Sequence, residues 1–256
     1  MSIANKRVVI TGGASGIGAA AVSALVAAGA RVASLDIKED AGHAIVAAAN
    51  ATGPGEAAFH RCDVSSRADV NRAFGEAADW LGGLDSLLHI AGYELTDPAE
   101  EISDEHWTTM MDVNARGTFL TNQAAFALLR DAGGNILNFS SAAGVIGMPG
   151  GAAYSAAKAA VLGWTRTVAK EWGRFDIRVN ACTPAMWTPM YDAHRAKFTP
   201  EETVAHDAMM AMIIPIGGKL GNPALDLAPF LIFMVGDGAR FITGQTLSVD
   251  GGMVIP

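Results

Sequence analysis

The chain has 256 residues, of which 50% are hydrophobic and 17% charged, a composition that can bury a substantial core within one domain. Its net charge of -8 argues against a nucleic-acid partner, because nucleic-acid binding normally requires a basic surface. The apolar run at 227–235 is interrupted by proline and is far shorter than the ~20 residues that cross a bilayer, so we expect no membrane partner.

Short apolar and β-branched runs alternate along the chain with longer alanine-rich segments. The first run starts at residue 7, which leaves no room for a cleavable targeting segment, so we expect a cytoplasmic protein. The intervening segments carry apolar residues at helical spacing and often stop at glycine, as residues 17–28 do before Gly29. We therefore predict seven strands, at 7–11, 31–36, 57–62, 86–91, 135–140, 178–183 and 245–249.

This alternation favours one α/β domain over residues 1–256. It is typical of a Rossmann-type, doubly wound sheet of seven mainly parallel strands with helices on both faces, which binds ligands at the carboxyl ends of its strands. Residues 185–222 interrupt the pattern, and we expect them to form a lid over the substrate site. Within the lid, Thr199 followed by Pro200 and Glu202 is typical of a helix start, after which Val204, Ala208, Ala211 and Met212 share one face.

A glycine-rich loop joins the first predicted strand to the first predicted helix. It reads TGGASGIG over residues 11–18, and its backbone N–H groups, together with the positive end of the helix, can bind a pyrophosphate. The motif is weak when taken alone, because glycines also occupy tight strand-to-helix turns that bind no ligand. We predict that a dinucleotide contacts five residues of this loop, Gly12, Ser15, Gly16, Ile17 and Gly18.

Acidic residues end or follow the second and third predicted strands. Asp36 lies about 20 residues beyond the loop, where a carboxylate can bond both hydroxyls of an adenosine ribose. A carboxylate beside a 2'-phosphate would cost up to ~4 kcal/mol at about 4 Å and an effective dielectric of about 20, so we expect NAD, with NADP disfavoured. Lys38 nearby softens this discrimination. Asp63 and Val64 lie where the adenine would rest, and the alternative for Asp63 is a helix or turn cap.

Tyr154 and Lys158 lie four residues apart on a helix predicted over 152–172, so both project from one face. Phenol titrates near 10, and a pKa near 7 requires ~4 kcal/mol of preferential stabilisation of the phenolate. One cation about 4 Å away supplies that amount at an effective dielectric of about 20. We therefore predict that Tyr154 acts as a general base near neutral pH. The alternative is a half-buried tyrosine beside a solvated lysine.

With Asn114 and Ser141, these motifs resemble in order and spacing the classical short-chain dehydrogenase/reductase family, over essentially the whole chain. The resemblance implies four catalytic residues, Asn114, Ser141, Tyr154 and Lys158. Ser141 would bond the substrate oxygen, with Ser140 as the alternative. Asn114 would hold a water that joins the lysine to solvent, or else satisfy a helix kink. Lys158 would also bond the nicotinamide ribose.

The resemblance implies further cofactor contacts at Ala91, Gly92, Pro184 and Thr188, close to two departures from the family pattern. The family usually carries Asn-Asn-Ala-Gly after the fourth strand, whereas this chain has His89 and Ile90 in the first two positions. We expect a structural role for His89 and leave the sheet bonding there open. After Pro184 the usual glycine is replaced by Ala185 and the segment is one residue shorter, which leaves the position of Thr188 open.

The family resemblance implies an NAD(H)-dependent oxidoreductase that interconverts a secondary alcohol and a ketone by hydride transfer, with Tyr154 as general acid/base. The alternatives are an NADP(H)-dependent carbonyl reductase, a non-catalytic nicotinamide-binding protein, and an enzyme acting on an activated C=C bond. The methionine-rich lid favours an apolar cyclic or aromatic substrate. The tail at 244–252 resembles that of the family, which implies a homotetramer or homodimer. We expect no metal site and interpret Cys62 and Cys182 as packed, reduced thiols.

Overall fold

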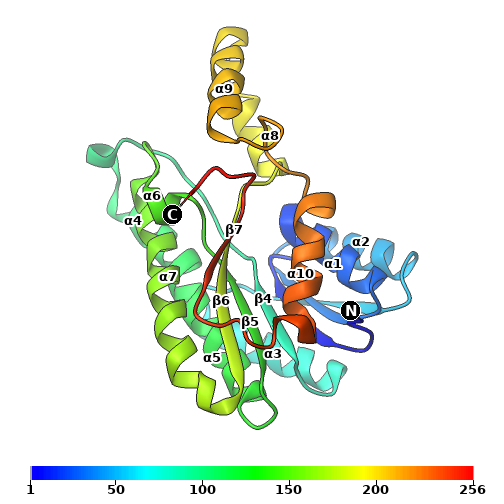
Figure 1. Cartoon of the computed structure of the whole chain (residues 1–256). Coiled ribbons are helices and arrows are strands. Elements are labelled where there is room, and N and C mark those ends of the chain that lie inside the picture. Colours follow the sequence, from blue (N-terminus) through cyan, green and yellow to red (C-terminus); the bar gives the residue numbers. More distant parts are fainter. Residues whose placement is uncertain (1, 256) are drawn as a thin grey trace.

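All seven predicted runs form strands in the computed structural model, which describes residues 2–255 apart from the side chain of His194. Each neighbouring pair of strands is parallel, and the spatial order is β3-β2-β1-β4-β5-β6-β7 (Figure 1). The predicted fold class is confirmed. The strands are β1 (Arg7–Thr11), β2 (Arg31–Asp36), β3 (Glu56–Arg61), β4 (Ser86–His89), β5 (Gly134–Phe139), β6 (Ile177–Pro184) and β7 (Thr246–Val249).

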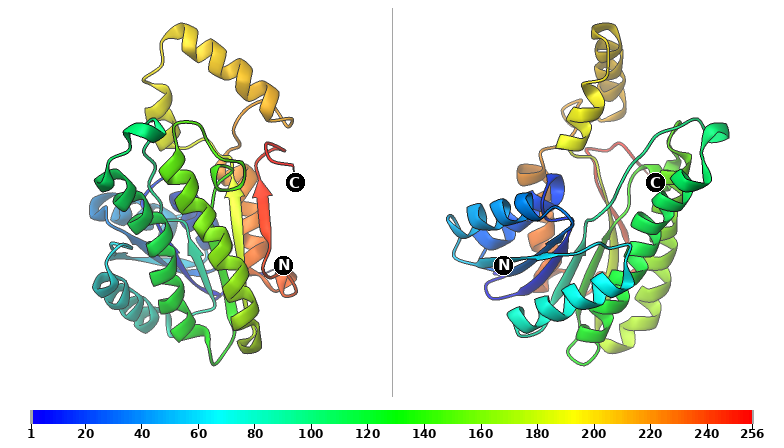
Figure 2. Two further views of the ribbon diagram at one scale, coloured as in Figure 1. Left: turned by 90° about the vertical axis from the view of Figure 1, so that its left-hand side faces the viewer. Right: turned by 180° about the vertical axis from the view of Figure 1, so that it is seen from behind.

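Helices cover both faces of the sheet (Figures 1 and 2). One layer contains α1 (Gly16–Ala27), α2 (Glu39–Asn50) and α10 (Ala228–Val235), and the other contains α3 (Arg67–Leu81), α4 (Asp104–Met110), α5 (Gly117–Leu129) and α7 (Ala152–Trp172). The 14-residue helix α9 (Pro200–Ile213) lies in the lid segment. The remaining helices are short: η1 (Ala99–Glu101), η2 (Met111–Arg116), α6 (Ala143–Ile146), η3 (Gly173–Phe175), α8 (Pro189–Arg195), η4 (Pro223–Leu227) and η5 (Asp237–Ala239). No helix within residues 2–255 has the length and apolar character needed to cross a membrane.

The central strands bury both of their faces. Successive side chains of a strand point to opposite faces, so Val8 and Ile10 pack with the α1 and α10 layer while Val9 packs with the α3 and α5 layer. All three side chains are fully buried. This two-sided burial is typical of parallel sheets, and it explains why the strands read as continuous apolar runs.

The strand order places a topological switch at β1. This strand pairs with β2 on one side and β4 on the other, so the connections that follow β1 and β4 leave the sheet in different directions. Doubly wound sheets bind ligands at the carboxyl ends of strands where this reversal occurs. The glycine-rich loop follows β1, and Ala91 with Gly92 follows β4, so both predicted cofactor segments lie at the switch.

The lid segment, residues 185–222, extends beyond the carboxyl end of the sheet, where α8 and α9 project away from the body (Figures 1 and 2). The predicted start of α9 is confirmed. The Glu202 N–H donates to Thr199 Oγ1 at 3.2 Å, and the Thr199 N–H donates to Glu202 Oε2 at 2.8 Å. The predicted apolar face of α9 is exposed, with Val204 71% and Met212 84% accessible, whereas Met210 is buried.

Candidate active site

Glycines allow the loop after β1 to pack closely against the end of β4. Gly12 and Gly16 have φ values of 74° and 53°, which glycine adopts without strain. A Cβ at Gly12 would lie 2.8 Å from the Ala91 backbone, and one at Gly18 would lie 1.9 Å from the Gly12 carbonyl oxygen. Because these positions carry no side chain, the loop and α1 can pack closely against the predicted contact Ala91.

The loop ends at the start of α1 with donors available for an anion. The first-turn N–H groups of a helix have no intrahelical acceptors, and the side chain of the N-cap residue Ser15 makes no capping bond to them. Ser15 is exposed and Ile17 is partly exposed. The positive end of the helix dipole favours negative charge at this place, so the geometry fits a phosphate group.

The start of the lid reaches the same loop despite its altered sequence. Pro184 ends β6, and the next residue is held in place, because the Ala185 N–H donates to the Val249 carbonyl at 3.1 Å. A Cβ at Gly16 would lie 3.6 Å from Thr188 Cβ, so the predicted residue Thr188 lies beside the glycine-rich loop. The segment that is one residue shorter still brings Thr188 to the glycine-rich loop.

Asp36 is held rigidly beside the glycine-rich loop. Its Oδ2 accepts a hydrogen bond from the Ala14 N–H at 3.0 Å, and its Oδ1 accepts one from the Lys38 N–H at 3.0 Å. The half-buried carboxylate therefore lies at the carboxyl end of β2, adjacent to the switch point. This is the position that a ribose-binding acid requires.

Asp63 forms the turn cap that the sequence left as an alternative. Its Oδ1 accepts from the Ser65 N–H at 2.9 Å and from the Ser65 hydroxyl at 2.6 Å. Val64 is buried, and a Cβ at Gly117 would lie 3.1 Å from Val64 Cγ2. Contacts of Asp63 and Val64 with an adenine remain predictions.

Helix α7 carries Tyr154 and Lys158 on one face, and β5 delivers Ser141 to them. The Lys158 Nζ lies 5.7 Å from the centre of the Tyr154 ring and donates to the Phe139 carbonyl at 3.0 Å. The Ser141 side chain reaches the Tyr154 phenol, whereas the buried Ser140 hydroxyl donates to the Lys158 carbonyl at 2.8 Å. Alternation along the chain thus turns Ser141, and not Ser140, toward the tyrosine.

Burial has the largest effect on the pKa values of Tyr154 and Lys158. Desolvation raises the pKa of Tyr154 to about 12, the charge of Glu94 acts in the same direction, and hydrogen bonding by Ser141 opposes both. Desolvation also lowers the pKa of Lys158 to about 8, an effect that Glu94 partly offsets. The expectation that Lys158 brings the pKa of Tyr154 near 7 is wrong for the protein by itself, because desolvation of the phenolate has the larger effect.

Asn114 connects the catalytic helix layer to the segment after β4. It lies in the π-helical turn η2, where its Nδ2 donates to the Met110 carbonyl at 3.1 Å and to the Tyr93 carbonyl at 2.8 Å. A Cβ at Gly92 would lie 3.0 Å from Asn114 Oδ1 and 3.1 Å from Lys158 Nζ. The structure therefore brings Asn114, Gly92 and Lys158 together, while Asn114 also satisfies the irregular helix.

His89 is enclosed between β1 and α5. The ring is fully buried, and its Nδ1 lies 2.9 Å from Thr11 Oγ1 and 3.1 Å from Thr121 Oγ1. Thr11 pairs with His89 in regular parallel register, so the sheet bonding tolerates the departure from asparagine. Desolvation lowers the pKa of His89 to about 3, so the ring is neutral at physiological pH.

We expect His89→Asn to weaken the loss of stability in acid. An unfolded histidine takes up a proton below its pKa of about 6.5, whereas folded His89 does so only near 3, so the native state loses stability as the pH falls below 6.5. Between pH 7 and pH 5 this linkage amounts to about 2 kcal/mol. Urea unfolding at pH 7 and pH 5 measures the free energy of unfolding at each pH. The decrease in this free energy between the two pH values should be smaller by that amount in His89→Asn than in the unmodified protein.

The matched control is His43→Asn, because His43 is an exposed histidine on α2. Comparing each variant with itself at the two pH values removes any general effect of the substitution. An acid-induced loss as large in His89→Asn as in the unmodified protein would contradict the expected linkage.

Both cysteines lie in the interior. Cys62 and Cys182 are buried and free, and burial raises the pKa of each thiol, for Cys62 to about 12. Such thiols behave as small hydrophobic side chains with little thiolate character. Within residues 2–255 no group of three or more histidine, cysteine, aspartate or glutamate side chains is arranged to hold a metal ion.

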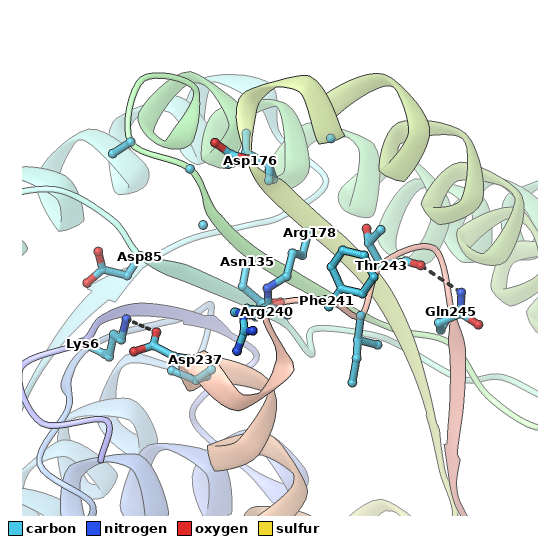
Figure 3. Close-up of a pocket in the computed structure, with 17 residues that line it drawn as sticks. Lys6, Asp85, Asn135, Asp176, Arg178, Asp237, Arg240, Phe241, Thr243 and Gln245 are labelled. Atoms are coloured by element: carbon cyan, nitrogen blue, oxygen red, sulfur yellow. Dashed lines mark hydrogen bonds and ion pairs between the residues drawn. The ribbon is translucent and has the colours of Figure 1, made fainter. Parts of the chain in front are cut away.

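The structure has cavities away from the predicted catalytic residues. One of about 760 Å³ lies at the amino ends of the strands and is lined by polar and charged side chains, including Lys6 bonded to Asp237 at 2.9 Å (Figure 3). None of the predicted site residues lines it. Another of about 270 Å³ lies at the lid between Trp187, Tyr191 and Met210, close in sequence to Thr188.

Sequence reasoning missed Glu94. This half-buried residue follows Gly92 by two positions, and its charge acts on both Tyr154 and Lys158. The sequence signal that could have identified Glu94 is its position two residues after Gly92, in the segment that follows the fourth strand. A carboxylate has no role in the pattern of loop, tyrosine and lysine, so the pattern alone gave no reason to select it.

Comparison with known proteins places the whole chain among dehydrogenases. Residues 12–254 match a family model described as enoyl-(acyl carrier protein) reductase. The chain is 38% identical over 254 residues to 2,5-dichloro-2,5-cyclohexadiene-1,4-diol dehydrogenase of Sphingobium indicum, covering 98% of this chain and 97% of the relative. It is 33% identical to NAD-dependent glycerol dehydrogenase of Listeria innocua, over 99% of this chain and 96% of that protein.

Solved structures share the fold of this chain. A short-chain type dehydrogenase/reductase from Mycobacterium ulcerans superposes with a TM-score of 0.91 at 29% identity. The superposition covers 99% of this chain and 91% of that chain. The structural similarity therefore extends over nearly the whole of this chain.

Proposed function

The chain belongs to the classical short-chain dehydrogenase/reductase family, and on that premise we propose that it oxidises a secondary alcohol to a ketone with NAD and catalyses the reverse reaction. It is an oxidoreductase of a family that uses nicotinamide cofactors. The observation that carries the proposal is the grouping of Tyr154, Lys158 and Ser141 at the carboxyl end of the sheet. Lys158 lies beside Gly92, whose neighbour Ala91 packs against Gly12 of the glycine-rich loop.

The residues present fit a dinucleotide. The loop has the close approaches at Gly12 and Gly18 that a Cβ would prevent, and the first turn of α1 presents N–H groups to a pyrophosphate. Asp36 would hold the adenosine ribose, which favours NAD over NADP because its charge repels a 2'-phosphate. The name of the NAD-dependent relative supports the same preference.

When bound, the oxidised nicotinamide supplies the hydride acceptor and a positive charge beside the reacting group. Within the chain, Ser141 would hold the substrate oxygen, and the Tyr154 hydroxyl oxygen would accept or return its proton. With a raised pKa, Tyr154 holds its proton at neutral pH, the state that a general acid needs for ketone reduction. Alcohol oxidation needs the phenolate, which the positive charge of Lys158 favours. Asn114, whose side chain bonds the Tyr93 backbone beside Gly92, would hold a water that joins Lys158 to solvent.

The lid supports an apolar cyclic or aromatic substrate. Met190 and Met209 are 53% and 48% exposed on helices that project beyond the site, and Trp187 at the base of the lid is 37% exposed. Flexible thioether side chains adapt to irregular apolar shapes. One relative, the Sphingobium indicum dehydrogenase, is named for a cyclic alcohol, in agreement with this class.

Reduction of an activated C=C bond is the second candidate, favoured by the description of the matching family model. The spacing of Tyr154 and Lys158, four residues apart on α7, favours the alcohol reaction instead. The homotetramer, or homodimer, implied by the family resemblance remains a prediction that light scattering can test.

The experiment is an assay of secondary alcohols, the matching ketones and an enoyl thioester with NAD(H) and NADP(H). We expect turnover of cyclic alcohols with NAD, weaker turnover with NADP, and none of the thioester. Turnover of the thioester alone would replace this proposal with the second candidate. Absence of turnover with every substrate, despite measurable NADH binding, would favour a non-catalytic nicotinamide-binding protein.

A further inference from the structure

Helix α7 begins without a side-chain cap, although its first turn carries Tyr154. Its N-cap residue is Gly151, which has no side chain to offer to the N–H groups of the first turn. Tyr154 is the third residue of the helix, and helix ends open more readily than helix interiors. The position of the reacting hydroxyl therefore depends on what holds the start of α7 from outside the helix.

Asp97 holds the start of α7 through its backbone. Its N–H donates to the Gly150 carbonyl at 2.8 Å, and Asp97 forms a parallel bridge with Gly151. The Gly151 carbonyl accepts from the Ser155 N–H at 2.8 Å, so the bridge leads directly into the turn that contains Tyr154. Asp97 is exposed and lies outside every helix and strand, so its own position depends on a further contact.

The buried imidazole of His106 provides this contact. Its Nδ1 lies 2.5 Å from Asp97 Oδ2, and because an ionised carboxylate only accepts hydrogen bonds, Nδ1 carries the proton and donates it. The residue is 7% exposed, and its Nε2 is buried without a hydrogen-bond partner among the described residues. A leucine would fill the same space and leave no polar atom unpaired, so the bond to Asp97 is what a histidine contributes here.

His106 and Asn114 belong to one continuous helical segment, in which α4 passes directly into η2. α4 packs against the catalytic helix α7 (Figure 1). Residues 93–97 are bonded to this segment at both ends. At one end Asn114 Nδ2 donates to the Tyr93 carbonyl at 2.8 Å, and at the other end His106 bonds Asp97. The segment therefore fixes the chain that holds the start of α7.

We propose that His106 is a positioning residue, whose bond to Asp97 fixes the first turn of α7 and so the place of the Tyr154 hydroxyl relative to Ser141. The inference rests on the proposed role of Tyr154 in alcohol oxidation. His106 acts through Asp97 and Gly151 and not on the substrate itself. A displacement of about 1 Å at a reacting group can lower the rate on the order of 10²-fold, so a bond outside the site can determine turnover.

The first test compares His106→Leu with His106→Asn in kcat, using NAD and the cyclic alcohol that is turned over fastest. The amide nitrogen of asparagine takes about the place of Nδ1 and can still donate to Asp97, whereas leucine fills the space and donates nothing. We expect kcat to fall about 10-fold in His106→Leu and less than about 3-fold in His106→Asn. The free energy of unfolding should be lower in His106→Asn than in His106→Leu, because the smaller side chain leaves a cavity.

The opposite orders of kcat and stability separate positioning from a merely structural role. If His106 only stabilised the fold, kcat would follow stability, and His106→Asn would be the less active variant. NADH titration followed by fluorescence counts the folded sites in each preparation. The dissociation constant of NADH should change by less than about 2-fold in both variants, so that the loss lies in kcat and not in cofactor binding.

The second test removes the other partner of the bond. Asp97→Ala deletes an exposed carboxylate and retains the backbone bonds to Gly150 and Gly151, so this variant is expected to fold. It should lower kcat about 10-fold, and adding His106→Leu should lower kcat no further, because both substitutions remove the same bond. Glu105→Gln, which changes the exposed neighbour of His106 on α4, is the control and should retain full turnover.

Three results would each overturn this inference alone. They are a kcat of His106→Leu within about 2-fold of the unmodified enzyme, kcat values of the two His106 variants that follow their stabilities, and losses that multiply to about 100-fold in the double variant. Failure of the unmodified enzyme to oxidise any secondary alcohol would instead overturn the proposed function, and this inference with it.

Discussion

Replacing Tyr154 by phenylalanine is expected to lower kcat for alcohol oxidation by 10²–10⁴-fold, the usual contribution of a positioned general acid or base. The substitution removes only the hydroxyl that exchanges a proton with the substrate. The ring remains on α7, and Lys158 still donates to the Phe139 carbonyl through Nζ. Steady-state kinetics with NAD and a cyclic alcohol measure the effect.

The control for this variant is Tyr93→Phe, which removes a hydroxyl from a tyrosine that is 42% exposed. It should retain nearly full turnover, because the bonds of Tyr93 to Asn114 use its backbone. NADH affinity, followed by fluorescence, should change little in Tyr154→Phe and so separate loss of chemistry from loss of the cofactor site. Undiminished turnover by Tyr154→Phe would refute the assigned role of Tyr154.

Replacing Asp36 by asparagine is expected to shift cofactor preference toward NADP. The NAD to NADP ratio of kcat/KM should fall by about 10²–10³-fold, since one charge pair near 4 Å contributes up to ~4 kcal/mol at an effective dielectric of about 20. The Ala14 and Lys38 N–H groups hold the half-buried carboxylate at the carboxyl end of β2, where the proposed ribose would bind. Asparagine has almost the same shape, so the loop keeps one of its two acceptors.

Asp40→Asn is the matched control, because Asp40 is an exposed acid in the first turn of α2, four residues further along the chain. It should change the ratio by less than about 3-fold, since screening by solvent weakens exposed charges. An unchanged ratio in Asp36→Asn, or an unmodified enzyme that already prefers NADP, would contradict the assignment of Asp36 to the ribose.

The strands were predictable because each is a run of apolar or β-branched residues between helical segments. The bounds of β1 and β2 agree with the prediction, and β3 differs by a single residue at each end. The α9 start was predictable for a similar reason, since a capping box involves only neighbouring residues. Signals of this kind involve only neighbouring residues, so they do not depend on how the rest of the chain folds.

The site was predictable where motif and alternation decide the geometry. Tyr154 and Lys158 share a face because of helical periodicity, and Ser141 faces them while Ser140 turns back to the helix. The turn cap of Asp63 was one of two alternatives that its sequence neighbours allowed. In each case the decisive contact joins residues whose relative positions follow from one helix, one strand end or one turn.

The pKa direction of Tyr154, the exposure of the α9 face and the position of Glu94 depend instead on packing between distant segments. The sequence pattern placed a cation near the phenol but contained no measure of the desolvation that outweighs it. It marked an apolar face on α9 but not the direction in which the lid projects. Backbone conformation and the periodicity of helix and strand faces are local properties, which the order of the residues determines. Burial and electrostatic neighbours arise only from the packing of distant segments, and this packing determined the surroundings of Tyr154 and Lys158.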